Sequence, residues 1–149
     1  MRHRAAGCLL LALAASCTFT FAAEFRAASE DAVLLYDAPS AQSKKLFIVS
    51  RGYPLEVIVV LQGWVKVRDA NGALSWVEAG KVSTKPRTVL VKTSVGQIRQ
   101  AAEDNAPVVF QARQNVVMEL TEVVAGGWLR VRHQDGVSGF IRVAQVWGV

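Results

Sequence analysis

Two segments of the chain, residues 63–76 and 127–140, have nearly the same sequence. They read GWVKVRDANGALSW and GWLRVRHQDGVSGF, and they align without a gap at an offset of 64 residues. An internal repeat constrains the fold more strongly than composition does, because each copy must be one structural unit of the same design. The chain is therefore expected to contain two small modules that share one architecture.

The similarity continues upstream of this repeat at an offset of 63, because Gly126 is one extra residue in the second copy. Leu35 then aligns with Ile98, so an apolar position is kept. Gly52 aligns with Asn115, and these two residue types best tolerate a left-handed turn conformation. The alignment predicts the same left-handed turn at one place in both modules.

Each copy has the pattern of short strands separated by turns. In the first copy we expect strands at 32–36, 46–49, 55–61, 64–68 and 73–78, with a turn at 80–83. In the second copy we expect strands at 88–92, 95–99, 108–112, 117–124, 128–132, 137–142 and 144–147. The pattern predicts an all-β chain of two small β-barrels, one over 24–84 and one over 89–149. The intervening residues 85–88, which contain Pro86, have the composition of an exposed linker.

The repeated segment is expected to be a hairpin. DANG and HQDG are typical of a three-residue loop that ends in a left-handed glycine. Side chains alternate across a strand, so each hairpin has a core face of Val and Leu and a second face of aromatic and cationic residues. The opposed pairs predicted are Val65–Val77, Val67–Ser75, Lys66–Trp76 and Trp64–Glu78 in the first copy, and Leu129–Ile141 and Arg130–Phe140 in the second.

The chain begins with a sequence typical of a secretory signal peptide. MRHRAAGCLLLALAASCTFTFAAEF places cations first, then an apolar stretch, then small residues. This order predicts a signal peptide over residues 1–23, cleaved after Ala22 or Ala23, and an exported chain in the periplasm. Two alternatives stay open, an uncleaved anchor over 5–23 and a lipid attached to Cys17. Contact with a membrane is expected only in those two cases.

Maturation also simplifies the chemistry of the chain. Both cysteines, Cys8 and Cys17, lie in the leader, so no disulfide or thiol site is expected in the mature protein. The 17 basic and 12 acidic residues give a net charge of +5, which falls to +3 when Arg2 and Arg4 are removed. That surplus is too small for a basic nucleic-acid-binding face, so nucleic acid is not an expected partner.

The titratable residues of the mature chain do not form a catalytic set. His133, its one histidine, occupies a turn position where the first copy has Asp69, and we expect it to be exposed rather than a base. One histidine without cysteine cannot supply a zinc site. Residues 103–105 (EDN) lack the spaced ligands and turn glycine of a calcium loop. We therefore expect no catalytic residue, metal or cofactor, and the chain is not predicted to be an enzyme.

The order of motifs resembles the bacterial SH3 (SH3b) domain, and the chain resembles a tandem pair of such domains. The resemblance depends on IRQAAEDNAPVVFQARQNVVMEL and GGWLRVRHQDGVSGFIRVAQV in the second copy, and it extends over nearly all of 25–149. The first copy has LLYDAPS where the family usually has an Asn-x-Arg step, whereas the second keeps Arg99. The resemblance implies two SH3-like barrels that act as non-catalytic binding modules of exported proteins, for cell-wall peptides or for other proteins.

The resemblance also implies a ligand groove between an RT-type loop, at 36–46 or 99–109, and the loop before the Gly-Trp strand. Aromatic side chains suit grooves that bind extended peptides, and cations beside them suit carboxylates. The predicted ligand-binding residues are Tyr36, Trp64, Lys66 and Trp76 in the first copy, and Arg99, Trp128, Arg130 and Phe140 in the second. Each of them also fits a purely structural role in the core, the seam or a solvated strand face.

Two functions are consistent with these features. The first is a periplasmic binding protein that recognises peptidoglycan stem peptides or a cell-wall-associated protein. The second is a structural module that joins proteins of an envelope complex. An exposed aromatic groove would favour peptide binding, and a flat apolar patch would favour a protein partner. We expect a monomer in either case, with Trp147 fastening the last strand to its barrel.

Overall fold

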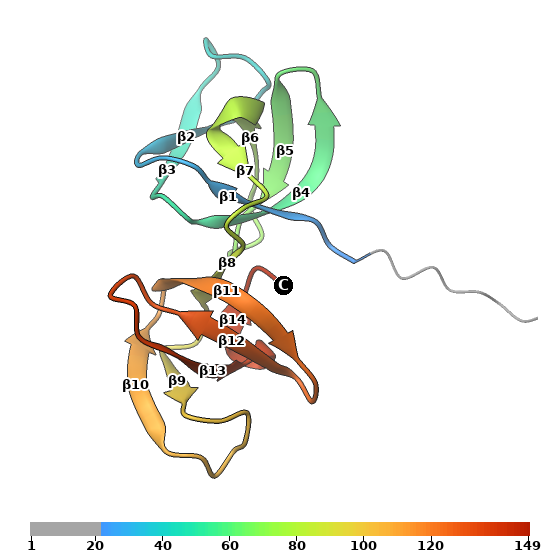
Figure 1. The fold of residues 1–149 in the computed structure, drawn as a ribbon. Helices are drawn as coiled ribbons and strands as arrows, with labels where there is room; N and C mark the ends of the chain where they lie inside the picture. The colour runs from blue at the N-terminus through green and yellow to red at the C-terminus, as the bar shows by residue number, and fades with distance from the viewer. Residues whose placement is uncertain (1–21) are drawn as a thin grey trace, which may run out of the picture.

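The computed structural model describes residues 22–149, which form two β-modules joined end to end (Figure 1). The predicted signal peptide therefore lies almost entirely outside the described residues. Across residues 22–149, no helix is long and apolar enough to cross a membrane.

The same arrangement of strands occurs in both modules. The first module has the sheet order β3-β2-β6-β5-β4-β1-β7, and the second has the order β10-β9-β13-β12-β11-β8-β14. Adding seven to each label of the first sheet gives the second, so the predicted tandem of all-β modules is confirmed. The first-module elements are β1 Phe25–Ala28, β2 Val33–Tyr36, β3 Lys45–Val49, β4 Pro54–Leu61, β5 Trp64–Arg68, β6 Leu74–Glu78, the 3-10 helix η1 Ala79–Lys81 and β7 Val82–Ser83. The second-module elements are β8 Thr88–Val91, β9 Val95–Arg99, β10 Val108–Arg113, β11 Val117–Val124, β12 Trp128–Arg132, β13 Ser138–Arg142, η2 Val143–Gln145 and β14 Val146–Trp147.

Three elements differ from the sequence prediction, and one of them is the two-residue strand β7, which lies within the predicted turn at 80–83. Strand β1 was not predicted, because FRAA carries a charge and two alanines and lacks a β-branched pattern. It nevertheless pairs with both β4 and β7, as β8 pairs with β11 and β14 in the second module. Residues 144–147 were predicted as one strand, but the chain forms η2 before the two-residue strand β14.

The central hairpin has the predicted register in both modules. Val65 lies opposite Val77, Lys66 opposite Trp76, and Arg130 opposite Phe140. Each turn is a three-residue loop that ends in a left-handed glycine, with φ of 87° at Gly72 and 91° at Gly136. The other predicted left-handed turn is also present, because Gly52 has φ of 80° and Asn115 has φ of 69°.

Each module has its own aliphatic core, formed by the inward faces of its strands. A fully buried Val, Leu, Ile or Met side chain contributes about 1.5–3 kcal/mol to the free energy of unfolding relative to an exposed one. The two cores use equivalent residues, so the inner face of each hairpin is used for folding and its outer face is left for other contacts. The first core comprises Ala28, Val33, Leu35, Val49, Leu55, Val65, Val67, Val77 and Val82, and the second comprises Val89, Val91, Ile98, Ala112, Met118, Leu120, Leu129, Val131, Ile141 and Val146.

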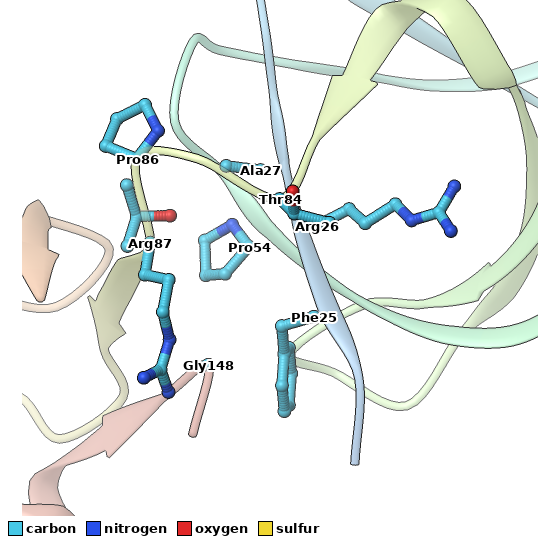
Figure 2. Close-up of a pocket in the computed structure, with 9 residues that line it drawn as sticks. Phe25, Arg26, Ala27, Pro54, Thr84, Pro86, Arg87 and Gly148 are labelled. Carbon is cyan, nitrogen blue, oxygen red and sulfur yellow. The ribbon is translucent and has the colours of Figure 1, made fainter. Parts of the chain in front are cut away.

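The two modules touch along a short seam. The hydroxyl of Thr88 donates a hydrogen bond of 2.6 Å to the carbonyl oxygen of Gly52. Figure 2 shows another part of the seam, where Phe25 and Pro54 of the first module lie beside Arg87 and Gly148. The hollow there has a volume of only about 10 Å³, so it holds no more than one water molecule and is a packing seam.

Candidate functional site

The four candidate residues of the first module lie together on the outer face of its sheet. Tyr36, at the end of β2, lies opposite Trp76 of β6, and Trp76 lies opposite Lys66 of β5. The ring of Tyr36 meets the ring of Trp64 edge to face, with 5.4 Å between centroids. The Lys66 ammonium nitrogen is 5.8 Å from the centroid of Trp76. We call this surface, formed by Tyr36, Trp64, Lys66 and Trp76, the first-module aromatic face.

Burial differs among these side chains. Tyr36 is only 4% exposed, because Trp64 covers its ring. Trp64, Lys66 and Trp76 are half-buried, so part of each side chain is open to solvent. An indole has a large apolar surface and one polar N–H, which suits contact with an extended peptide. The accessible part of the first-module aromatic face is therefore formed by its two tryptophans and its lysine.

The equivalent residues of the second module are arranged differently. Arg99 donates hydrogen bonds to the carbonyl oxygen of Ala106 at 2.7 Å and to the side chain of Gln97 at 2.6 Å. Its guanidinium therefore braces the RT-type loop. Phe140 lies opposite both Arg99 and Arg130, and Arg130 is exposed.

Trp128 of the second module is covered by an arginine. Its side chain is 3% exposed, and the guanidinium carbon of Arg142 lies 4.2 Å from its ring centroid. Arg142 also donates to the carbonyl oxygen of Gly126 at 2.8 Å and, through Nε, to Asp104 at 3.0 Å. A second guanidinium nitrogen of Arg142 contacts the other Asp104 oxygen. The RT-type loop is thus tied across the tryptophan, and we call this arrangement the Arg142 strap.

The Arg142 strap was missed by sequence reasoning, although the repeat contained a signal for it. At the same offsets that align the modules, Arg142 corresponds to Glu78 and Asp104 corresponds to Ala41. The first module therefore lacks both partners of the strap. The hydrogen bond from Arg142 holds the pKa of Asp104 below its usual value, so this carboxylate is ionised at neutral pH.

His133 lies in a half-buried position, not the exposed one that its turn location predicted. Its ring centroid is 5.9 Å from that of Phe110, and its Nδ1 is 3.1 Å from a carboxylate oxygen of Asp135. The apolar surface of Phe110 gives the imidazole a place to pack, which Asp69 cannot use in the first module. The backbone N–H of Val137 and then His133 lower the pKa of Asp135.

The described part of the chain, residues 22–149, contains no group of three or more His, Cys, Asp or Glu side chains placed to hold a metal ion.

Comparison with known proteins gives the family. Two stretches of the chain, 29–84 and 92–148, match the family model of the bacterial SH3 domain. The chain belongs to the bacterial SH3 domain family. Each matched stretch lies within one of the two modules, so the chain is a tandem pair of bacterial SH3 domains. Bacterial SH3 domains are binding modules of the cell wall and occur in exported or envelope proteins.

The individual proteins compared with this chain resemble it less closely than the family model does. Among curated proteins, none matches the chain. The structure of NlpC2 from Trichomonas vaginalis is 11% identical, with a TM-score of 0.36, and the match covers 85% of this chain and 48% of that one. An NlpC/P60 family protein from Bacillus cereus is 13% identical, with a TM-score of 0.39, and the match covers 83% and 55%. The chain spans about half the length of these solved structures.

Proposed function

We propose that the protein is an exported, non-catalytic binding protein whose first SH3 domain recognises peptidoglycan stem peptides through the first-module aromatic face. One observation carries this proposal, the difference between the two equivalent tryptophans. Trp64 is partly open beside Lys66 and Trp76, whereas Trp128 is sealed by Arg142. Leaving indole surface in water costs hydrophobic free energy, and the second domain demonstrates that this fold can cover it. An open tryptophan in one copy is therefore best explained by a ligand.

Charge supports a peptide with carboxylates. Lys66 lies beside Trp76, and in the outer row of β5 the next cation is Arg68. Arg68 is paired with Glu56 at 2.9 Å, whereas Lys66 has no ion-pair partner within residues 22–149. The free ammonium of Lys66 is the cation on this face that would meet a ligand carboxylate.

Retention on purified sacculi tests the proposal. We expect the chain from residue 24 onward to be retained, and we expect Lys66→Gln and Trp64→Ala, each checked to be folded, to lose retention. Arg130→Gln is the matched control, because Arg130 occupies the position of Lys66 in the second domain. Failure of the unmodified chain to bind sacculi would contradict the proposal. Equal losses in Lys66→Gln and Arg130→Gln would contradict the assignment to the first domain.

A second candidate, a structural module of an envelope complex, is favoured by a separate surface. The end of β4 exposes four consecutive aliphatic side chains, Ile58, Val59, Val60 and Leu61, each 36% to 54% exposed. Strand β1 pairs only with residues 54–56, so this end of β4 is not covered by it. Site-specific crosslinking from Val60 in the periplasm would capture a protein partner if this surface is the functional one. The absence of any crosslinked protein would exclude this candidate.

A further inference from the structure

A second hollow, larger than the one at the seam, lies next to the first-module aromatic face. It has a volume of about 170 Å³, and Tyr36, Glu30, Glu78 and Lys81 contribute to its lining. Glu78 ends β6 directly opposite Trp64, and Tyr36 packs against the ring of the same tryptophan. The hollow therefore adjoins the proposed peptide-binding surface, and we call it the Tyr36 hollow.

The ionised groups of the Tyr36 hollow have a net charge of minus one. Lys81 Nζ lies 2.7 Å from a carboxylate oxygen of Glu30, and this hydrogen bond raises the pKa of Lys81. Glu78 has no ion-pair or hydrogen-bond partner for its side chain within residues 22–149. An ammonium group has three N–H donors, so Lys81 keeps donors that Glu30 does not use. The hollow thus offers one free carboxylate and one partly free ammonium.

Tyr36 adds a polar group with no intramolecular partner to the lining of the hollow. Its side chain is 96% buried, since only 4% is exposed, yet its hydroxyl makes no hydrogen bond within the described residues. No fully buried side-chain oxygen or nitrogen in that part of the chain lacks a partner. The Tyr36 hydroxyl is therefore accessible to solvent, and Tyr36 is one of the residues that line the hollow. A hydroxyl can both donate and accept a hydrogen bond, so a polar ligand group that enters the hollow can use it.

The fold itself does not require this arrangement. Arg142, at the position of Glu78, covers Trp128, and Arg99, at the position of Tyr36, braces a loop. The charge is thus reversed between Glu78 and Arg142, and an arginine replaces the neutral Tyr36. The second-domain residues aligned with Glu30, Tyr36, Glu78 and Lys81 are Thr93, Arg99, Arg142 and Gln145.

We propose that the Tyr36 hollow binds a free amino-acid end of the peptide, a primary ammonium group beside a carboxylate. The ligand ammonium donates to the carboxylate of Glu78 and to the hydroxyl oxygen of Tyr36. The ligand carboxylate accepts from Lys81, which stays fixed by Glu30. Because the hollow has a net negative charge, a carboxylate without an ammonium is repelled. This inference rests on the proposed function, since it assigns one end of the peptide that the first-module aromatic face holds.

The test uses two small probes of the same carbon skeleton, meso-diaminopimelate and pimelate, which differ only in the two amino groups. In NMR titrations of the purified protein, we expect diaminopimelate to shift the backbone signals of Glu30, Tyr36, Glu78 and Lys81, and pimelate to leave them unchanged. Glu78→Gln and Tyr36→Phe should each weaken binding by about tenfold, the loss expected for one charge-assisted hydrogen bond. Tyr36→Phe keeps the fold, because the hydroxyl has no intramolecular partner. Glu122→Gln, an exposed carboxylate on β11, is the charge-matched control and should bind like the unmodified protein.

Three results would overturn the assignment: equal binding of pimelate, unchanged affinity in Glu78→Gln, or no shift at the hollow with diaminopimelate. The sacculus assay separates this inference from the proposed function. Retention on sacculi without diaminopimelate binding would overturn only the assignment of the Tyr36 hollow as the amino-acid site. Diaminopimelate binding without retention on sacculi would support the amino-acid site in the Tyr36 hollow and overturn the proposed wall-binding function.

Discussion

The indole Nε1 of Trp147 donates a hydrogen bond of 3.2 Å to the carbonyl oxygen of Pro54, which belongs to the other domain. The same indole meets the ring of Phe25 edge to face, with 5.2 Å between centroids. The sequence predicted that Trp147 fastens the last strand to its own barrel. Its backbone does pair with Leu90 there, but its side chain reaches the first domain. One residue thus closes the second barrel and joins the two domains.

This junction holds the two domains in one orientation relative to each other. Thr88 donates to Gly52 on another part of the seam. Gly148 packs so closely against the first domain that an added Cβ would lie 3.1 Å from Pro54 Cβ. Contacts at several points resist rotation about the linker better than one contact does. The second domain, with its sealed tryptophan, then acts as a rigid support for the open face of the first.

Trp147→Ala should loosen the seam. The substitution removes an aromatic pair worth about 0.5–1.5 kcal/mol and a hydrogen bond worth about 0.5–1.5 kcal/mol. We expect a lower denaturant midpoint and a loss of cooperativity between the domains, measured by urea unfolding with far-UV circular dichroism. Trp147→Phe is the control, because it keeps the aromatic contact and loses only the hydrogen bond. An unchanged midpoint in Trp147→Ala would show that the seam contributes nothing to stability.

Thr88→Val tests the other part of the seam. Valine has nearly the same shape as threonine, so the substitution removes the hydrogen bond to Gly52 and little else. Thr88 is 8% exposed, and the loss should cost about 1 kcal/mol of unfolding free energy. Differential scanning calorimetry measures it. Thr93→Val serves as the comparison, because it removes a local hydrogen bond of 3.1 Å to the carbonyl oxygen of Val95 at a less buried position. A cost no greater than that of Thr93→Val would contradict the importance of this hydrogen bond.

Much of the fold followed from the sequence because it depends on local rules. Side chains alternate along a strand, so GWVKVR and the residues after DANG determined which side chains face the core. A turn glycine fixed the hairpin register, and the repeat confirmed it at a second place. The pairing of Lys66 with Trp76 is a consequence of that register, whereas Tyr36 lies opposite Trp76 through a separate pairing of β2 with β6.

The features that distinguish the two domains depend on contacts between distant residues, which alternation cannot predict. Asp104 and Arg142 are 38 residues apart, and neither has an unusual neighbour in the sequence. The free hydroxyl of Tyr36 depends on how Trp64 covers its ring, and the position of His133 depends on Phe110. The one sequence signal that could have predicted the difference was a reversal of charge between aligned positions, Glu78 and Arg142. It could have indicated that the tryptophan is partly open in the first domain and covered in the second.

Gly139→Ala should destabilise the second domain. A Cβ at Gly139 would collide with Ile98 Cγ2 and lie 2.8 Å from the carbonyl oxygen of Arg99. Overpacking of this kind costs about 1–3 kcal/mol, because backbone has to move. Thermal unfolding measures the change. Gly80→Ala is the control, since nothing lies within 4 Å of its Cβ position, and it should change stability by less than about 0.5 kcal/mol. Equal effects of the two substitutions would contradict the close packing at Gly139.

The Arg142 strap should release Trp128 in acid. The pKa of Asp104 is lowered from its ordinary value of 3.8 by the hydrogen bond from Arg142, so the folded carboxyl holds its proton less tightly than the unfolded one. The strap's contribution to stability is therefore complete above pH 3.8 and is lost as the pH falls through the lower pKa of the folded state. The Arg142 Nε–H signal in NMR, followed from pH 6 downward, should shift in that acidic range together with the signals of loop 100–107.

Asp104→Asn removes the titrating group, so its Arg142 signal should not respond to pH in that range. Asp135 also has a lowered pKa, and its protonation changes the hairpin turn at Val137 rather than the strap. Asp135→Asn is therefore the control and should keep the pH response of Arg142. A response that survives in Asp104→Asn, or that disappears in Asp135→Asn, would mean that Asp104 does not hold Arg142 over Trp128. The position of Arg142 over Trp128 would then need another explanation, because no other carboxylate within the described residues contacts that guanidinium.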